Sequence, residues 1–250
     1  MTYCVGMLMD AGLVLLSDTR TNAGVDQVNT FRKMNIFEKP GERMLVLLSA
    51  GNLAITQAVV SLSRERLDSD GASLYTEANM FEVARHVGDC IRAAHERDAA
   101  ALSAFGIEFN ASFILAGQIA GEMPRLFSIY AAGNFIEATP ETPYFQIGES
   151  KYGKPIIDRI FNWQSSLTDA AKCALISMDS TLKSNLSVGL PLDLLCYRRD
   201  SLRAENRVSI DASHPFFSEL RKLWGERIKQ AFIDLPALDW QACTGKSRQQ

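Results

Sequence analysis

The amino-acid sequence predicts an α+β fold, a four-layer αββα sandwich in which two antiparallel sheets lie face to face between two layers of helices. Predicted helices come in pairs between runs of strands, whereas a parallel βαβ fold would place single helices between single strands. The first strands are apolar on both faces, which is typical of a sheet covered on both sides. The chain shows no linker, internal repeat or low-complexity segment, so we expect one domain over residues 1–240 and a polar tail over 241–250.

The first half of the chain is predicted to form two hairpins followed by a helix pair. Asp10-Ala11-Gly12 joins two short apolar runs, which is the pattern of a tight β-hairpin turn. A polar loop is expected from Asp18 to Gly24. Gly51 is expected to open one helix, and apolar residues at helical spacing predict a second helix over residues 75–102. Strands are predicted over residues 2–9, 12–17, 33–38 and 44–50.

The second half continues with strands, a helix pair, two strands and a final helix. Two consecutive helices can cover the outer face of one sheet, and this gives the outer layers of the sandwich. The last helix is expected to turn five apolar side chains inward: Phe217, Leu220, Leu223, Trp224 and Ile228. Strands are predicted over residues 111–120, 125–132, 135–138, 144–147, 192–198 and 207–210. Helices are predicted over residues 154–163, 168–184 and 215–232.

The composition argues against several classes of function. Of 250 residues, 47% are hydrophobic and the net charge is −3, so the chain can bury a large core but has no basic field for nucleic acid. No apolar run approaches about 18 residues, so we expect no membrane span. Without a basic and apolar leader, we expect a cytoplasmic protein. The five cysteines are scattered and the three histidines lack ligand-like spacing, which predicts reduced thiols and neither a metal nor a cofactor.

The beginning of the chain carries the first candidate for chemistry. Initiator Met1 is usually removed when a small residue follows, and removal would make Thr2 the amino terminus. An α-amine has an unperturbed pKa of about 7.7–8.0, so much of it is neutral near physiological pH. It can then accept the hydroxyl proton of its own residue, and a terminal Thr is a recognised activated nucleophile. Thr at position two is also common in ordinary proteins, so this feature alone does not establish catalysis.

Three further residues fall where they would support Thr2. A lysine at position 33 would bring positive charge near the α-amine, and like charge disfavours the protonated amine. Asp18, at the end of the second strand, would hold Lys33 in place. Gly51 stands where a strand meets a helix, so its backbone N–H could stabilise a developing oxyanion. Taken singly, each has an ordinary alternative: a turn residue, a strand-edge charge and a helix start.

Four segments within residues 2–51 resemble the landmarks of proteasome β-type subunits. Those landmarks are a terminal Thr, a D-x-R-x-x-x-G loop, a Lys about thirty residues along, and a small residue with Gly before the first helix. The chain looks most like the bacterial proteasome-related family called Anbu, the ancestral β-subunit group, over essentially its whole length. The matching segments are Thr2-Tyr3-Cys4-Val5-Gly6, Ser17-Asp18-Thr19-Arg20-Thr21-Asn22-Ala23-Gly24, Arg32-Lys33-Met34 and Ser49-Ala50-Gly51.

The resemblance implies the N-terminal-nucleophile hydrolase fold and assigns roles to residues. Thr2 would be nucleophile and base, Lys33 would tune it, and Asp18 would hold Lys33. In the same way, Arg20 would support the loop and Gly51 would be the oxyanion donor. Asn22, Ser49 and Leu53 fall where the family binds substrate.

The later half of the chain departs from the proteasome pattern. Proteasome subunits place a Ser after a Gly before the third helix; here Glu149 takes that place and Ser150 follows it. They also end the fourth helix with an Asp followed shortly by a Ser. That Asp falls on Ser184 or Asn185, neither of which is a carboxylate, and Ser187 lies just beyond. We therefore include Ser150, Asn185 and Ser187 among the candidate catalytic residues.

The function implied by the resemblance is a threonine peptidase that hydrolyses peptide amide bonds through an acyl-enzyme. Two alternatives stay open: an amidase or transferase that acts on a specific small peptide conjugate, and a catalytically weak scaffold subunit. Persistence of Met1 would favour the scaffold, because a blocked amine cannot act as a base. The resemblance also implies self-association into a ring or helical homo-oligomer, and an ATPase or amide-ligase-type partner is conceivable. No nucleic-acid or membrane partner is expected.

Overall fold

The structure, a computed structural model, describes residues 2–22, 28–65 and 73–239. Contacts group the chain into two compact units, Met1–His214 and Pro215–Gln250, which are described separately. The tail predicted over residues 241–250 lies outside the described residues, and the single domain predicted over residues 1–240 stays a prediction. None of the helices in the described part of the chain is long and apolar enough to cross a membrane.

The first sheet contains β1, the first strand of the chain, as an inner strand. Its strand order is β10-β1-β2-β11-β12, and every neighbouring pair is antiparallel. Because β1 pairs with β2 on one side and β10 on the other, the residue before β1 is held between two strands. The strands are β1 (Tyr3–Met9), β2 (Gly12–Asp18), β10 (Tyr144–Gly148), β11 (Leu192–Arg198) and β12 (Asn206–Ile210).

The second sheet has the order β5-β6-β7-β8-β9 and is also antiparallel throughout. Its strands are β5 (Met34–Lys39), β6 (Arg43–Gly51), β7 (Ala111–Ile119), β8 (Arg125–Ile129) and β9 (Phe135–Glu137). A separate two-stranded ribbon pairs β3 (Arg20–Asn22) with β4 (Val28–Thr30). The predicted polar loop from Asp18 to Gly24 is therefore wrong for residues 20–22, because pairing with β4 makes them a strand.

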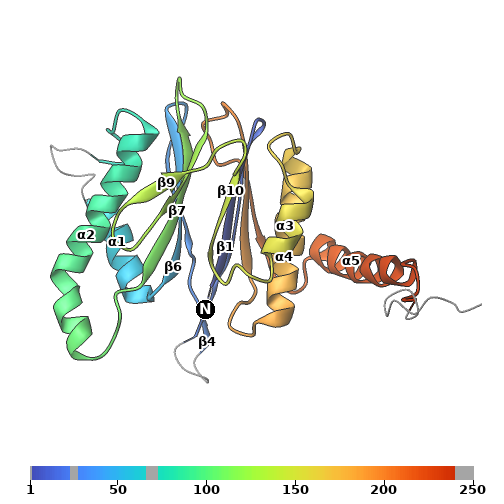
Figure 1. Ribbon diagram of the computed structural model, residues 1–250. Helices are drawn as coiled ribbons and strands as arrows, with labels where there is room; N and C mark the ends of the chain where they lie inside the picture. Colours follow the sequence, from blue (N-terminus) through green and yellow to red (C-terminus); the bar gives the residue numbers. More distant parts are fainter. Residues whose placement is uncertain (1, 23–27, 66–72, 240–250) are drawn as a thin grey trace, which may run out of the picture. The chain divides into compact units, whose positions relative to one another are not determined.

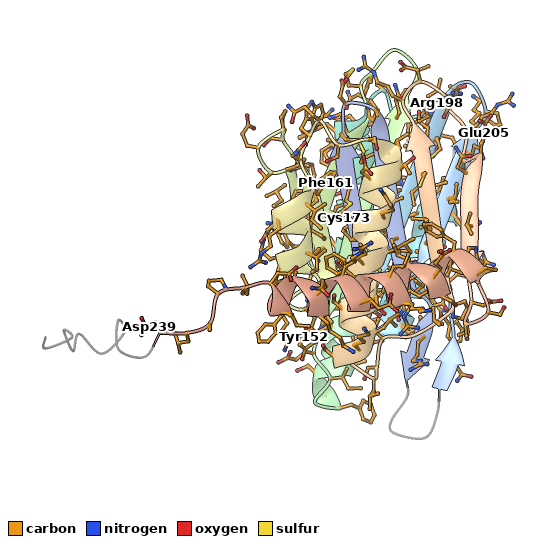
Figure 2. All side chains as sticks on the ribbon, turned by 90° about the vertical axis from the view of Figure 1, so that its right-hand side faces the viewer. Tyr152, Phe161, Cys173, Arg198, Glu205 and Asp239 are labelled. Atoms are coloured by element: carbon orange, nitrogen blue, oxygen red, sulfur yellow. The ribbon has the colours of Figure 1, made fainter. Side chains whose placement is uncertain are left out.

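Two helix layers cover the outer faces of the sheets, so the predicted four-layer αββα sandwich is confirmed (Figure 1). On one side, α1 (Leu53–Glu65) and α2 (Met80–Ala104) pack on the sheet that contains β6 and β7. On the other side, α3 (Lys154–Ile160) and α4 (Leu167–Ser184) form the second layer, and α4 packs on β1, β2 and β11. Cys173 of α4 is labelled in Figure 2 and is nearly fully buried.

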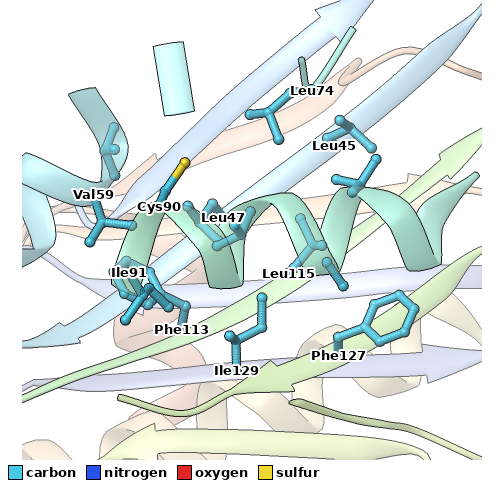
Figure 3. Close-up of a cluster of buried hydrophobic side chains, with 14 of the residues drawn as sticks. Leu45, Leu47, Val59, Leu74, Cys90, Ile91, Phe113, Leu115, Phe127 and Ile129 are labelled. Carbon is cyan, nitrogen blue, oxygen red and sulfur yellow. The ribbon is translucent and has the colours of Figure 1, made fainter. Parts of the chain in front are cut away.

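Apolar side chains fill the spaces between these layers. One cluster lies between the two sheets and includes Leu15 from β2 and Val46 from β6. Another lies between the second sheet and its helices, where Ile91 of α2 lies near Phe113 and Leu115 of β7 (Figure 3). Both faces of the central strands are therefore buried, and this explains why their sequence shows no inward–outward alternation. Among the described cysteines, Cys4, Cys173 and Cys196 are free thiols.

The predicted boundaries are wrong at two helix starts, and capping by asparagine explains both. Gly51 ends β6, and the Asn52 side chain accepts a hydrogen bond of 3.0 Å from the Ala54 amide at the start of α1. Helix α2 begins at Met80 instead of residue 75, because the Asn79 side chain accepts from the Glu82 amide at 2.9 Å. Residues 161–163, expected to be helical, lie beyond the end of α3 at Ile160.

The second unit contains helix α5 (Pro215–Ile233). Its Phe217 is buried, as predicted, and the guanidinium of Arg221 lies over the Phe217 ring. Leu223 and Ile228, in contrast, are 46% and 47% exposed, so the prediction that they point inward is wrong. Helical spacing of apolar residues identifies a face that can be covered, but it does not specify a covering element within the same chain.

Candidate active site

Thr2 lies directly before β1 and is held by the end of β10. Tyr3 pairs with Gly148, and the Glu149 amide donates to the Thr2 carbonyl oxygen at 2.7 Å. Gly148 has a φ of +80°, and a Cβ at this position would lie 2.0 Å from the Thr2 carbonyl oxygen. Only glycine permits so close an approach of the two backbones. Thr2 is thereby fixed through its main chain and is 9% exposed.

Lys33 and Asp18 form a buried ion pair beside the start of β1. Lys33 Nζ lies 2.7 Å from Asp18 Oδ1 and donates a second hydrogen bond of 2.6 Å to the Arg20 carbonyl oxygen. The side chains of Lys33 and Asp18 are 6% and 0% exposed, respectively. Asp18 also accepts from the amides of Tyr3 and Gly189, at 3.1 and 3.4 Å. The carboxylate therefore bridges the first residue of β1, the lysine and the loop before β11.

The electrostatics of this pair place a fixed positive charge in the site. Burial raises the pKa of the Asp18 carboxyl, while the Lys33 charge and the hydrogen bonds from Lys33, Tyr3 and Gly189 oppose that rise. A buried charge is tolerated when it is paired and hydrogen-bonded, and both conditions hold for Asp18. Lys33 and Thr2 line the same cleft. A positive charge there would disfavour protonation of a free Thr2 amine.

The cleft has a volume of about 810 Å³ and is lined by most of the site residues predicted among positions 2–53. Thr2, Lys33, Ser49, Gly51 and Leu53 all line it. Seven further lining residues were not predicted: Thr21, Ala50, Asn52, Thr56, Asn110, Ser112 and Gly148. Two of these, Asn110 and Ser112, are far from Gly51 in the sequence. They line the cleft because the β6–β7 register places Gly51 opposite Ala111. No local sequence pattern indicates that pairing.

Gly51 is constrained to be glycine by its backbone. Its φ is +117°, a conformation that other residues rarely adopt, and an added Cβ would lie 2.4 Å from the Asn110 carbonyl oxygen. The following residue continues this contact, since the Asn52 amide donates to Asn110 O at 2.8 Å. The site therefore requires an unsubstituted backbone on one wall of the cleft, and the role of Gly51 as an oxyanion donor stays a prediction.

Three candidates lie in or against the loop after α4 and do not line the cleft. Arg20 Nη1 donates to the Leu186 carbonyl oxygen at 2.9 Å. Asn185 binds the Glu149 carboxylate through Nδ2 at 3.0 Å and accepts from the Ser187 amide at 2.9 Å. Arg20, Asn185 and Ser187 thus meet at this loop, and catalytic roles for all three stay predictions.

Three predictions lie elsewhere or outside the described part of the chain. The Ser150 carbonyl oxygen accepts from the Lys154 amide at 3.0 Å, at the entrance to α3. Asn22 pairs with Val28 in the β3–β4 ribbon, but its side chain lies outside the description. Met1 lies outside the described residues altogether. Roles for all three stay predictions.

Cys4 is the other nucleophilic side chain near Thr2, and its surroundings suppress its reactivity. The thiol is fully buried and lies 3.7 Å from the Ser49 carbonyl oxygen. Burial raises the pKa of the Cys4 thiol, and the neighbouring Asp18 charge raises it further, against a smaller lowering by Lys33. Because the thiolate is the nucleophile, Cys4 is inert at neutral pH. Among the described residues, no group of three or more His, Cys, Asp or Glu side chains could hold a metal ion.

The two stacked sheets, the outer helix pairs and the position of Thr2 define the proteasome-like N-terminal-nucleophile fold. Solved structures place the chain more narrowly. Anbu (ancestral beta-subunit) from Yersinia bercovieri is 53% identical, with 95% of this chain and 99% of that chain covered and a TM-score of 0.90. The Anbu (Gly-1) mutant from Hyphomicrobium sp. strain MC1 is 50% identical, covering 96% and 100%, with a TM-score of 0.90.

A third structure, the helical assembly of the Anbu complex from Pseudomonas aeruginosa, is 46% identical, covering 95% and 98%, with a TM-score of 0.91. No family model and no curated protein matches the chain. Identity near 50% over nearly the whole of both chains is decisive. The chain belongs to the Anbu family, as its sequence predicts.

Lys33→Met should destabilise the protein by about 3–5 kcal/mol, because it leaves the Asp18 carboxylate buried without its cation. The free energy of unfolding in urea measures this effect. The double variant Asp18→Asn/Lys33→Met should recover most of the lost stability, since neither position of the pair then carries a charge. Lys172→Met is the matched control: its ion pair with Asp169 is solvent-exposed and should contribute little. Equal stabilities of the Lys33→Met variant and the wild type would contradict the ion-pair argument.

Proposed function

We propose that this chain is an N-terminal threonine hydrolase that cleaves peptide amide bonds after removal of Met1. The observation that carries the proposal is the buried Asp18–Lys33 pair at 2.7 Å, with Lys33 on the same cleft as Thr2. A structural ion pair would not need to face a cleft of about 810 Å³. The nearby Gly51, whose close backbone contact admits no side chain, completes the arrangement. Membership of a proteasome-related family supports the same chemistry.

The proposed reaction has two halves. First, the Thr2 amine accepts the hydroxyl proton while Thr2 Oγ1 bonds to the carbonyl carbon of the substrate. Lys33 helps by keeping more of the amine neutral. The Gly51 N–H stabilises the tetrahedral oxyanion, the C–N bond breaks, and the amine passes its proton to the leaving nitrogen. In the second half, the amine takes a proton from water as the water oxygen bonds to the acyl carbon. The bond between that carbon and Thr2 Oγ1 then breaks, the amine returns the proton to Oγ1, and the carboxylic acid leaves.

Removal of the nucleophile gives the direct test. A peptide vinyl sulfone should add one covalent label to wild-type chains that lack Met1, and peptide mapping should place it on Thr2. Thr2→Ser should still be labelled, because it keeps a hydroxyl beside the amine, whereas Thr2→Ala should not. Intact mass reports Met1 removal and labelling in the same spectrum. Equal labelling of Thr2→Ala, or a label on Cys4, would refute the assignment.

The wall of the cleft suggests which peptides would fit. Its side chains are mostly neutral hydrogen-bonding groups, from Thr21, Ser49, Asn52, Thr56, Asn110 and Ser112. The Thr21 hydroxyl is buried and has no hydrogen-bond partner within the described chain. Sites that hold unpaired polar groups disfavour apolar ligands, which leave those groups unsatisfied. We therefore propose a preference for a neutral polar side chain, such as that of Gln or Asn, on the acyl side of the cleaved bond.

Ser112→Val should shift this preference toward apolar side chains, and Ser112→Thr should not. Val and Thr have nearly the same shape, and both suit the strand position of Ser112 in β7. They differ in the hydroxyl group. Vinyl sulfones that differ only in one side chain, Gln against Leu, should label wild type and Ser112→Thr with about a tenfold preference for Gln. An unchanged ratio in Ser112→Val would contradict the proposed polar pocket.

We also propose that the chain self-associates in the cytoplasm. The P. aeruginosa relative is described as a helical assembly of the Anbu complex, which supports a helical homo-oligomer here. A monomeric mass by light scattering at micromolar concentration would contradict it. An ATPase or amide-ligase-type partner stays a prediction from the resemblance, as do the conjugate-specific amidase and scaffold alternatives.

A further inference from the structure

Glu149 is hydrogen-bonded directly to the main chain of Thr2. Its amide donates to the Thr2 carbonyl oxygen at 2.7 Å. The preceding Gly148 has a φ of +80° and brings its Cα against the Thr2 carbonyl group, which fixes where Glu149 can lie. The residue is only 8% exposed. A buried acidic residue is therefore bound through its main chain to the proposed nucleophile.

The Glu149 carboxylate has one partly buried partner and one exposed partner in the described chain. Oε2 accepts a hydrogen bond of 3.0 Å from Asn185 Nδ2. Oε1 lies 3.8 Å from Lys151 Nζ, and the Lys151 side chain is 69% exposed. Exposed ion pairs contribute little. The Asn185 amide is thus the partner that determines the orientation of this carboxylate.

A backbone N–H of the same loop fixes which end of the Asn185 side-chain amide faces Glu149. The Ser187 backbone N–H can only donate, and it lies 2.9 Å from Asn185 Oδ1. Because Oδ1 must be the acceptor there, the NH₂ group faces Glu149, and Glu149 must accept. Asn185 itself is anchored at the end of α4, where its amide donates to the Thr181 carbonyl oxygen at 2.9 Å. Asn185 can therefore only donate to Glu149, and the direction of this hydrogen bond can be reversed only by substituting the two residues.

The same loop also holds the other charged residues of the site. Leu186 accepts from Arg20, and the Gly189 amide donates to Asp18. A Cβ on Gly189 would lie 2.1 Å from Arg20 Nε, so the guanidinium packs directly on this glycine. The Glu149–Asn185 contact therefore connects the Thr2 main chain to the loop that supports Asp18 and Arg20.

We propose that Glu149 is a positioning residue for Thr2, acting as the carboxylate half of a Glu149–Asn185 pair that joins the nucleophile to the loop after α4. The proposal rests on the proposed function for its catalytic consequence. The pair requires one carboxylate and one amide, and the Ser187 N–H requires an acceptor at position 185. An aspartate at position 185 with a glutamine at position 149 would meet both requirements with the two groups exchanged.

Exchange of the two groups tests the proposal. Asn185→Asp alone places two carboxylates face to face and should lower the maximal rate of vinyl sulfone labelling at Thr2 by about tenfold or more. The double variant Glu149→Gln/Asn185→Asp restores a carboxylate–amide contact and should return to within about threefold of wild type. The concentration giving half-maximal rate should stay the same, because the cleft is unaltered. Lys151→Met is the matched control and should label like wild type.

Thermal midpoints of the same variants separate this proposal from the proposed function. Asn185→Asp should lower the thermal midpoint, and Glu149→Gln/Asn185→Asp should restore it to near the wild-type value. Both results are expected whether or not any chain is labelled. Labelling of Asn185→Asp at the wild-type rate, or failure of the double variant to recover either quantity, would overturn the positioning role. Absence of label on wild type, with the thermal recovery intact, would overturn the threonine hydrolase and the catalytic consequence, but leave the pair as a structural contact.

Discussion

The buried ion pair between Lys33 and Asp18 is the interaction on which the site depends. Taking two charges out of water is costly, and the cost is offset only when the remaining hydrogen-bonding capacity is used. Asp18 uses it on the amides of Tyr3 and Gly189, and Lys33 on the Arg20 carbonyl oxygen. Four separate segments must therefore meet for the pair to be stable, and their meeting places Lys33 on the cleft beside Thr2.

Close backbone contacts set the remaining geometry. At Gly148 and Gly51, a Cβ would approach a carbonyl oxygen of the facing strand or loop to within 2.0 and 2.4 Å, respectively. The first contact holds the Thr2 main chain, and the second aligns the wall of the cleft with Asn110. Close packing of main chain on main chain leaves little freedom for either segment to shift. Such rigidity suits a site whose chemistry requires a nucleophile and an oxyanion donor in fixed positions.

Two departures from the proteasome pattern turn out to be neighbours. Glu149 and Asn185 are 36 positions apart in the chain, yet their side chains form one hydrogen bond. Each residue on its own lacks the chemistry of the residue expected there: Glu149 replaces a Ser, and Asn185 replaces an Asp. As a pair, they provide a residue with a carboxylate, next to the start of β1, and its hydrogen-bonded partner. The pair also shows how residues that do not line a cleft can contribute to it, through the main chain that they hold.

The sequence by itself determined the layered fold, because apolar periodicity and turn residues act over a few positions. Its resemblance to proteasome β-type subunits also predicted Thr2, Asp18, Lys33 and Gly51 as one set. The predicted starts of two helices were wrong because Asn52 and Asn79 form the caps, and apolar periodicity alone does not locate a cap. Only the tertiary structure decided that Asn110 and Ser112 share the cleft with Thr2, and that Glu149 binds Asn185. Strand register and loop packing join residues that are distant in the chain, and no single segment encodes such a contact.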